Sequence, residues 1–144
     1  MRRLSIAGGK DPTVRAAALA VLRAAGVAAH DALAEASALF QFVRDRIRFT
    51  RDPVGVEWLQ APRHTLTLLA GDCDDMATLL AAMLRTVGIP ARFRAVALEP
   101  NSNRYSHVYV VASVKGQDLP LDPIYRDNMP GFGYSGVRAL EVPA

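Results

Sequence analysis

The spacing of apolar side chains predicts two amphipathic helices in the first third of the chain. Apolar residues recur three and four positions apart over residues 13–26, and Asp11 and Pro12 in front of them supply a capping residue and a first-turn proline. A second stripe of the same spacing begins after Asp31, which also caps helices well, and should end near Arg48. Each stripe has its own start signal, so we expect two separate helices.

A third apolar stripe predicts a helix from Cys73 to Thr86, which Gly88 and a proline two residues later bring to an end. The segment between the second and third helices, residues 49–59, contains a proline and a glycine and is expected to be irregular. A short helical turn is expected at about 64–69. The methionines of the third stripe lie on its apolar side, so we interpret them as core residues.

Beyond residue 90 the apolar positions alternate, which predicts strands. Three runs follow one another at residues 91–98, 105–115 and 118–122, separated by a polar turn over 99–104 and a tight turn at Gly116-Gln117. Consecutive strands with short links pair antiparallel. We therefore expect a three-stranded antiparallel meander.

Together these elements predict the α+β class, with N-terminal helices and the helix that carries the cysteine packed on a small antiparallel sheet. A chain of 144 residues, 51% of them hydrophobic, suits one domain with a sizeable core. We expect this domain to span residues 1–144, with the helical part over about 1–88 and the sheet and a C-terminal loop over about 89–144. The tail over residues 123–136 contains two prolines and three glycines and is typical of the long surface loops that border functional sites.

Charge and run lengths exclude several classes of function. The net charge is +3 and the pI is near 9.4, but the arginines are dispersed without a run of five basic residues, which argues against nucleic-acid binding. The most apolar run, residues 16–22, is far shorter than the ~20 residues that cross a bilayer, so we expect no membrane partner. The basic start of the chain does not resemble a secretory signal, and one cysteine excludes an internal disulfide. We therefore expect a cytoplasmic protein, in a bacterium or its host.

The segment Gly71-Asp72-Cys73-Asp74-Asp75 places the single cysteine at the start of the third predicted helix. Free cysteine is usually a small core residue, but burying three aspartates beside it would be costly. Carboxylates at a helix start instead cap free N–H groups, and we interpret Asp75 as such a cap. The helix end should lower the pKa of the thiol while the aspartates oppose this, so a nearby base is needed.

One histidine lies where it can serve as that base. His30 and His64 fall in turns, whereas His107 lies on the second strand and shares a face with Tyr105. Asp122 closes the next strand, so the hairpin can bring this carboxylate beside the imidazole at one end of the sheet. A carboxylate there can hold the imidazole tautomer while the imidazole deprotonates a thiol on the packed helix.

Four motifs together resemble the transglutaminase-like superfamily. They are the cysteine segment 71–75, the helix end 84–92, the strand 106–110 and the sequence Leu121-Asp122-Pro123, and the resemblance covers about 70–123. The segment 51–62 is similar to a compact branch found in phages and prophages, which extends the match to about 40–135. This family is similar in fold to papain-like cysteine proteases, in which a nucleophile helix packs on an antiparallel sheet that bears the histidine and the aspartate.

The resemblance implies a role for each matching residue. Cys73 matches the nucleophile, His107 the general base and acid, and Asp122 the residue that orients the imidazole. The implied chemistry is cysteine-dependent amide hydrolysis or acyl transfer through a thioester, on a peptide or protein that carries an amide. Water as acceptor makes the enzyme a peptidase, amidase or deamidase, and a lysine amine makes it a transglutaminase.

The oxyanion hole and the substrate contacts complete the predicted site. The Cys73 backbone N–H lacks an intrahelical acceptor and is a natural donor to an oxyanion. A second donor must come from upstream, where Gln60 is favoured over the indole N–H of Trp58. Trp58 is instead either a substrate contact or a core aromatic. Tyr105 is the second predicted substrate contact.

Three alternatives stay open at this point. A zinc site from Cys73, His107 and Asp122, with Asp72 or Asp74 as fourth ligand, lacks the paired spacings of structural zinc sites. A calcium site at the aspartates around the cysteine lacks the alternating acidic loop. A binding or assembly module of phage type would keep the fold and lose turnover. We expect no metal and find no cofactor motif.

Overall fold

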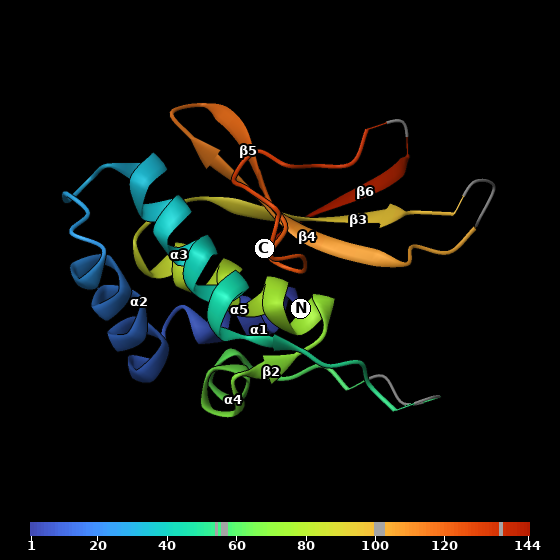
Figure 1. The fold of residues 1–144 in the computed structure, drawn as a ribbon, viewed down its shortest axis with the longest axis horizontal. Helices are drawn as coiled ribbons and strands as arrows, with labels where there is room; N and C mark the ends of the chain where they lie inside the picture. The colour runs from blue at the N-terminus through green and yellow to red at the C-terminus, as the bar shows by residue number, and fades with distance from the viewer. Residues whose placement is uncertain (54, 56–57, 100–102, 136) are drawn as a thin grey trace.

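The computed structural model describes residues 1–53, 55, 58–99, 103–135 and 137–144, and it confirms the α+β class. Figure 1 shows a group of helices beside a sheet whose strands run across the upper part of the view. The helix that carries Cys73 lies between them and contacts both layers. In the described part of the chain, no helix is long and apolar enough to cross a membrane.

Within the described residues, four helices precede the cysteine. They are α1 (Arg2–Gly8), α2 (Pro12–Ala24), α3 (Ala32–Arg46) and α4 (Pro62–Leu68). The two predicted caps are confirmed, because the Asp11 carboxylate accepts from the first-turn amides of α2 and the Asp31 carboxylate from Ala34. The expected turn at 64–69 is a helix that begins earlier, with Pro62 in its first turn.

Helix α1 was not expected from the sequence. Its seven residues include two arginines, and such a short helix is marginal without tertiary support. The support comes from close packing at its end, where a Cβ on Gly8 would lie 2.6 Å from the Pro62 ring and 3.0 Å from Ala82. Contacts distant in sequence therefore stabilise α1.

The cysteine helix, α5 (Cys73–Thr86), has the predicted bounds. Every residue from Asp75 to Leu84 is buried, as expected of a helix enclosed by other elements on all sides. Asp72 caps its first turn, and the Asp75 carboxylate accepts in return from the Asp72 amide, which completes a capping box. At its other end Gly88 takes a φ of +77°, a conformation that favours glycine.

The sheet comprises β3 (Ala91–Ala97), β4 (His107–Val114), β5 (Gln117–Leu121) and β6 (Arg138–Pro143). Its order is β5-β4-β3-β6 and every neighbouring pair is antiparallel, so the predicted meander is confirmed and extended by β6. Strand β6 was not expected from the sequence, because all its residues are exposed and it lacks a buried face. The predicted turn at Gly116-Gln117 is wrong by one residue. Lys115 and Gly116 form it, both with positive φ, as the two-residue turns that match strand twist require.

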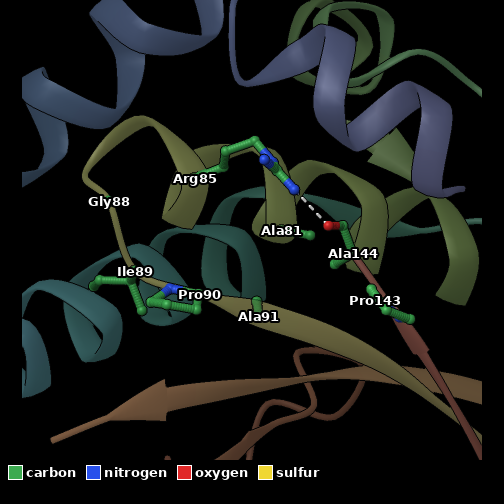
Figure 2. A pocket seen from close by; sticks show the side chains of 8 residues that line it. All are labelled: Ala81, Arg85, Gly88, Ile89, Pro90, Ala91, Pro143 and Ala144. Carbon is green, nitrogen blue, oxygen red and sulfur yellow. Dashed lines mark hydrogen bonds between the residues drawn. The ribbon is translucent and has the colours of Figure 1, made fainter.

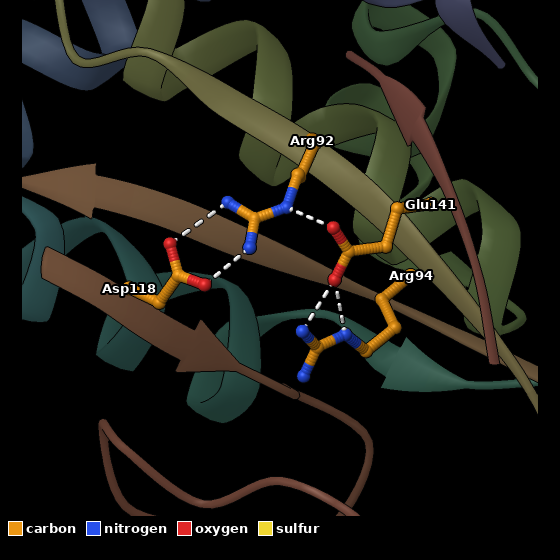
Figure 3. Close-up of polar contacts among 4 residues, drawn as sticks. All are labelled: Arg92, Arg94, Asp118 and Glu141. Atoms are coloured by element: carbon orange, nitrogen blue, oxygen red, sulfur yellow. Dashed lines mark hydrogen bonds and ion pairs between the residues drawn. The ribbon is translucent and has the colours of Figure 1, made fainter.

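The two faces of the sheet pack differently. The face formed by Val110, Ala112 and Val114 joins the main core with α5, whereas Val96, Tyr109 and Val111 form a small second cluster on the opposite face. On the outer surface Arg92 forms ion pairs with both Asp118 and Glu141, and Arg94 also pairs with Glu141 (Figure 3). This chain of charges links β5, β3 and β6, although each exposed pair adds little stability.

A short parallel pair places the upstream segment beside the cysteine. Strand β1 (Arg48–Phe49) pairs with β2 (Ala70–Gly71), and the Thr50 amide donates to the Gly71 carbonyl at 2.9 Å. Since β2 ends two residues before Cys73, the chain after α3 passes close to the start of α5.

Candidate functional site

The thiol of Cys73 lies at the first residue of α5 and is half-buried. Burial raises its pKa to about 11, and the negative charge of Asp72 acts in the same direction. The backbone groups of Val108 and of Cys73 itself lower the pKa of the thiol, but by less than burial and Asp72 raise it. The expected lowering by the helix end is therefore outweighed, and at neutral pH the thiol needs a base to ionise.

His107 and Asp122 form a buried pair. Nε2 of His107 lies 2.8 Å from Oδ2 of Asp122, and the two side chains are 8% and 0% exposed. His107 begins β4 and Asp122 follows β5, so the hairpin brings them together, as the sequence analysis expected. Because Nε2 is bonded to the carboxylate, Nδ1 is the ring nitrogen left for another partner.

The thiol meets β4 immediately after the histidine. The Val108 backbone lies near enough to the Cys73 sulfur to lower the pKa of the thiol, which places the sulfur at the start of this strand, one residue beyond His107. Within the described residues no hydrogen bond joins the sulfur to the imidazole itself. Catalytic hydrogen bonds are often long in the absence of substrate and tighten only when it binds.

Gln60 is bonded to α5 through Asp75. Its backbone N–H donates to Oδ1 of Asp75 at 2.7 Å, and its side-chain Nε2 donates to Oδ2 of Asp75 at 2.7 Å and to the Ala70 carbonyl at 3.4 Å. Both amide hydrogens of Nε2 therefore have acceptors. To donate to an oxyanion, as predicted, Gln60 would have to release one of them.

Asp75 caps α5 as expected, but it also does something that the sequence did not reveal. Its side chain is 1% exposed and accepts from Asp72 and twice from Gln60, so it joins the helix start to the segment upstream of α4. Burial raises the pKa of this carboxyl, and the three donors oppose that shift. An aspartate at the start of a helix does not by itself indicate that its carboxylate accepts hydrogen bonds from a residue fifteen positions upstream.

The predicted substrate contacts are exposed. Trp58 is 68% exposed, so it is not a core aromatic, and it lines a cavity of about 420 Å³ together with Gln60, His64 and Leu68. Tyr105 is 41% exposed, and the Arg138 guanidinium lies 4.9 Å above its ring. Trp58 therefore borders a space beside the start of α5, whereas Tyr105 lies against the start of β6.

The carboxylates around the thiol lie close together. Oxygens of Asp72, Asp74 and Asp75 lie within 4.8 Å of one another, and burial raises the pKa of Asp74 to about 8, with a further contribution from its hydrogen bond to Asp72. At neutral pH the Asp74 carboxyl therefore retains its proton. The grouping of potential metal ligands among the described residues does not include Cys73 or His107, so the zinc set considered from the sequence is not assembled.

Tyr134 belongs to the site although no motif pointed to it. Its hydroxyl donates to Oδ2 of Asp122 at 3.1 Å, and its ring meets the His107 ring edge-on at a centroid distance of 5.4 Å. It comes from the tail expected to be a surface loop, where sequence spacing gives no indication of contacts.

A second cavity lies at the other end of α5. It has a volume of about 390 Å³ and is lined by residues of the α5–β3 turn and the end of β6 (Figure 2). Arg85 there donates to the Ala144 carbonyl at 2.6 Å. Twelve positions of helix, or about 18 Å, separate Arg85 from Cys73, so this cavity is not part of the candidate site.

Comparison with known proteins identifies the fold. A proposed protease from Parabacteroides distasonis ATCC 8503 matches with a TM-score of 0.64 and 16% identity, over 83% of this chain and 25% of that one. A proposed cysteine protease from Cytophaga hutchinsonii matches with a TM-score of 0.57 and 17% identity, over 88% and 50%. The chain thus spans half or less of the length of these two proteins. Comparison with curated protein sequences gives no significant match.

The sequence itself matches a family model over most of the helical part and the first three strands of the sheet. The match runs over residues 22–123, which includes α5, the His107 strand and Asp122. The chain therefore belongs to the transglutaminase-like superfamily.

Proposed function

We propose that this chain is a cysteine-dependent amide hydrolase, of peptidase or amidase type, that acts through Cys73, His107 and Asp122. One observation carries the proposal. A buried imidazole, bonded through Nε2 to a buried carboxylate at 2.8 Å, lies one residue from the backbone group that contacts the only thiol. Nucleophile, base and orienting group in that order are the arrangement that covalent acyl chemistry needs.

The first step of the reaction is proton transfer. Ionising a thiol with a pKa of about 11 at pH 7 without a partner costs (11 − 7) × 1.36, or about 5.4 kcal/mol. The free Nδ1 of His107 takes the proton, and Asp122 stabilises the imidazolium that results. The thiolate then attacks the substrate carbonyl carbon and forms a C–S bond.

The remaining steps return the enzyme to its starting state. The Cys73 backbone N–H stabilises the oxyanion, and the C–N bond breaks as the imidazolium protonates the leaving amine. Water attacks the thioester while His107 removes its proton, the C–S bond breaks, and the thiolate is reprotonated. If a lysine amine attacks in place of water, the same residues perform acyl transfer.

The exposed Trp58 and the cavity that it lines indicate where a substrate would contact the protein. The cavity beside Trp58 borders Gln60, which is bonded to the first turn of α5, so a peptide side chain can enter it while an amide lies at the thiol. The proteins named above as proposed proteases have the same fold, which is in keeping with a peptide or protein substrate.

Alkylation of Cys73 by iodoacetamide tests the proposal without a known substrate. In the wild-type chain the rate should exceed that of free cysteine at neutral pH, because His107 draws the proton from the thiol. His107→Ala should shift the pH profile of alkylation to higher pH, because burial and the negative charge of Asp72 keep the pKa of the thiol high once no imidazole can take its proton. His30→Asn, which changes an exposed histidine between α2 and α3, is the control and should leave the profile unchanged.

Two results would contradict the proposal. A wild-type thiol no more reactive than free cysteine would favour the alternative of a binding or assembly module that lost turnover. An unchanged profile in His107→Ala would show that the imidazole does not serve the thiol. Cys73→Ala, which should abolish labelling and keep the fold, confirms that the reagent reads this residue.

A further inference from the structure

The Asp122 carboxylate receives more donors than the histidine alone provides. Oδ1 accepts from the Ile124 amide at 3.2 Å, and Oδ2 accepts from the Tyr134 hydroxyl at 3.1 Å in addition to its contact with Nε2 of His107 at 2.8 Å. Asp122 is fully buried, so these groups replace water around its charge. Two donors thus converge on the one oxygen that orients the imidazole.

Tyr134 contacts the imidazole as well as the carboxylate. The two rings meet edge-to-face, with an interplanar angle of 74° and centroids 5.4 Å apart, while Tyr109 stacks on His107 at 6.0 Å. The imidazole is therefore enclosed by two tyrosine rings and held at Nε2. Rotation of the ring would have to displace Tyr134.

The segment that carries Tyr134 is fixed to the rest of the molecule. The Gly131 amide donates to the Pro120 carbonyl at 2.8 Å, and the Asn128 side chain donates to the Asp122 carbonyl at 3.0 Å. Arg44 of α3 donates to the Asn128 carbonyl at 2.8 Å, which ties the segment to the helical layer. A rigid segment can hold its side chain in a defined place, as a positioning role requires.

The hydroxyl stays a donor over the working range of pH. Burial and the negative charge of Asp122 raise the pKa of Tyr134, so the phenol does not ionise there. With Oδ2 held between two donors, the carboxylate cannot rotate away from Nε2. The imidazole then keeps its proton on Nε2 and leaves Nδ1 as the acceptor for the thiol proton.

We propose that Tyr134 is a positioning residue that acts through Asp122: its hydroxyl fixes Oδ2 and its ring fixes the imidazole plane, which together select the Nε2–H tautomer of His107. The inference rests on the proposed function, since the tautomer matters only if Nδ1 serves Cys73.

Tyr134→Phe tests this role, because it removes the hydroxyl and keeps the ring. The matched control is Tyr125→Phe, the same change at an exposed tyrosine of the same segment. We expect the ¹⁵N spectrum of His107 to change from a single Nε2–H form to a mixture of tautomers in Tyr134→Phe only. Iodoacetamide labelling of Cys73 at neutral pH should slow about fivefold, the factor expected for loss of one hydrogen bond, and Tyr134→Leu should slow it further.

The outcomes separate this role from others. A single Nε2–H tautomer in Tyr134→Phe, or labelling that stays unchanged or becomes faster, would overturn the inference. Faster labelling would mean that the hydroxyl only withdraws charge from Asp122. A purely structural role would lower the unfolding midpoint and leave the tautomer intact. The ¹⁵N measurement does not need a reactive thiol, so it remains decisive if the proposed function fails.

Discussion

Replacing Asp74 by asparagine tests how the acidic start of α5 affects stability. The side chain is half-buried, and its Oδ1 has no hydrogen-bond partner in the described part of the chain. Burial, the hydrogen bond to Asp72 and the neighbouring charges raise its pKa from 3.8 to about 8. The folded protein therefore holds the proton of Asp74 more tightly than the unfolded chain does.

The sign of the effect follows from this difference in proton binding. A carboxyl whose pKa rises on folding contributes stability that is complete below about pH 4 and is lost as the pH rises through about 8. The limiting magnitude is (8 − 3.8) × 1.36, or about 5.7 kcal/mol. Water reaches part of the Asp74 side chain and screens its charge, so we expect this contribution to the free energy of unfolding to be about 2 kcal/mol.

The assay is urea unfolding followed by far-UV circular dichroism between about pH 5 and pH 9. The wild-type free energy of unfolding should fall over this range, and Asp74→Asn should lack about 2 kcal/mol of that fall. Asp127→Asn, at an exposed position, should keep the wild-type pH dependence. Equal pH dependence in wild type and Asp74→Asn would refute the reasoning.

Three further substitutions test separate features. Gly71→Ala should lower the labelling rate of Cys73 and the unfolding midpoint, because the added Cβ would lie 2.6 Å from the Asp75 side chain; an unchanged midpoint would contradict the close approach. Asp31→Ala should cost about 1 kcal/mol in urea unfolding through loss of the α3 cap, and a neutral result would show that the cap is dispensable. Lys115→Asn should stabilise the β4–β5 hairpin by about 0.5 kcal/mol, since asparagine adopts positive φ more readily, and a lower midpoint would count against this turn assignment.

Local signals explain which elements could be predicted. Helix α5 has a continuous apolar stripe, an aspartate cap and a glycine stop, and its predicted bounds are correct. Helix α1 and strand β6 have no such signals: the first is stabilised where Gly8 packs on Pro62, and the second by its pairing with β3. Both depend on partners far away in sequence.

The same distinction applies to the site. His107 and Asp122 are only fifteen positions apart and lie at the open end of one hairpin, so the sequence could predict their proximity. The contacts of Tyr134 and Gln60 come from irregular segments, whose paths no periodicity defines. The direction of the shift in the Cys73 pKa also needed the structure, because it depends on how much burial outweighs the helix end.

The division of the site between the two layers has a consequence for folding. The imidazole–carboxylate pair lies within one hairpin, which can form early because its contacts are local. The thiol belongs to α5 and reaches β4 only when the helical layer docks on the sheet. Under the proposed mechanism the cysteine therefore reacts slowly, like a free thiol, until the chain has folded. It becomes reactive only when the helical layer docks on the sheet and brings the thiol to the imidazole.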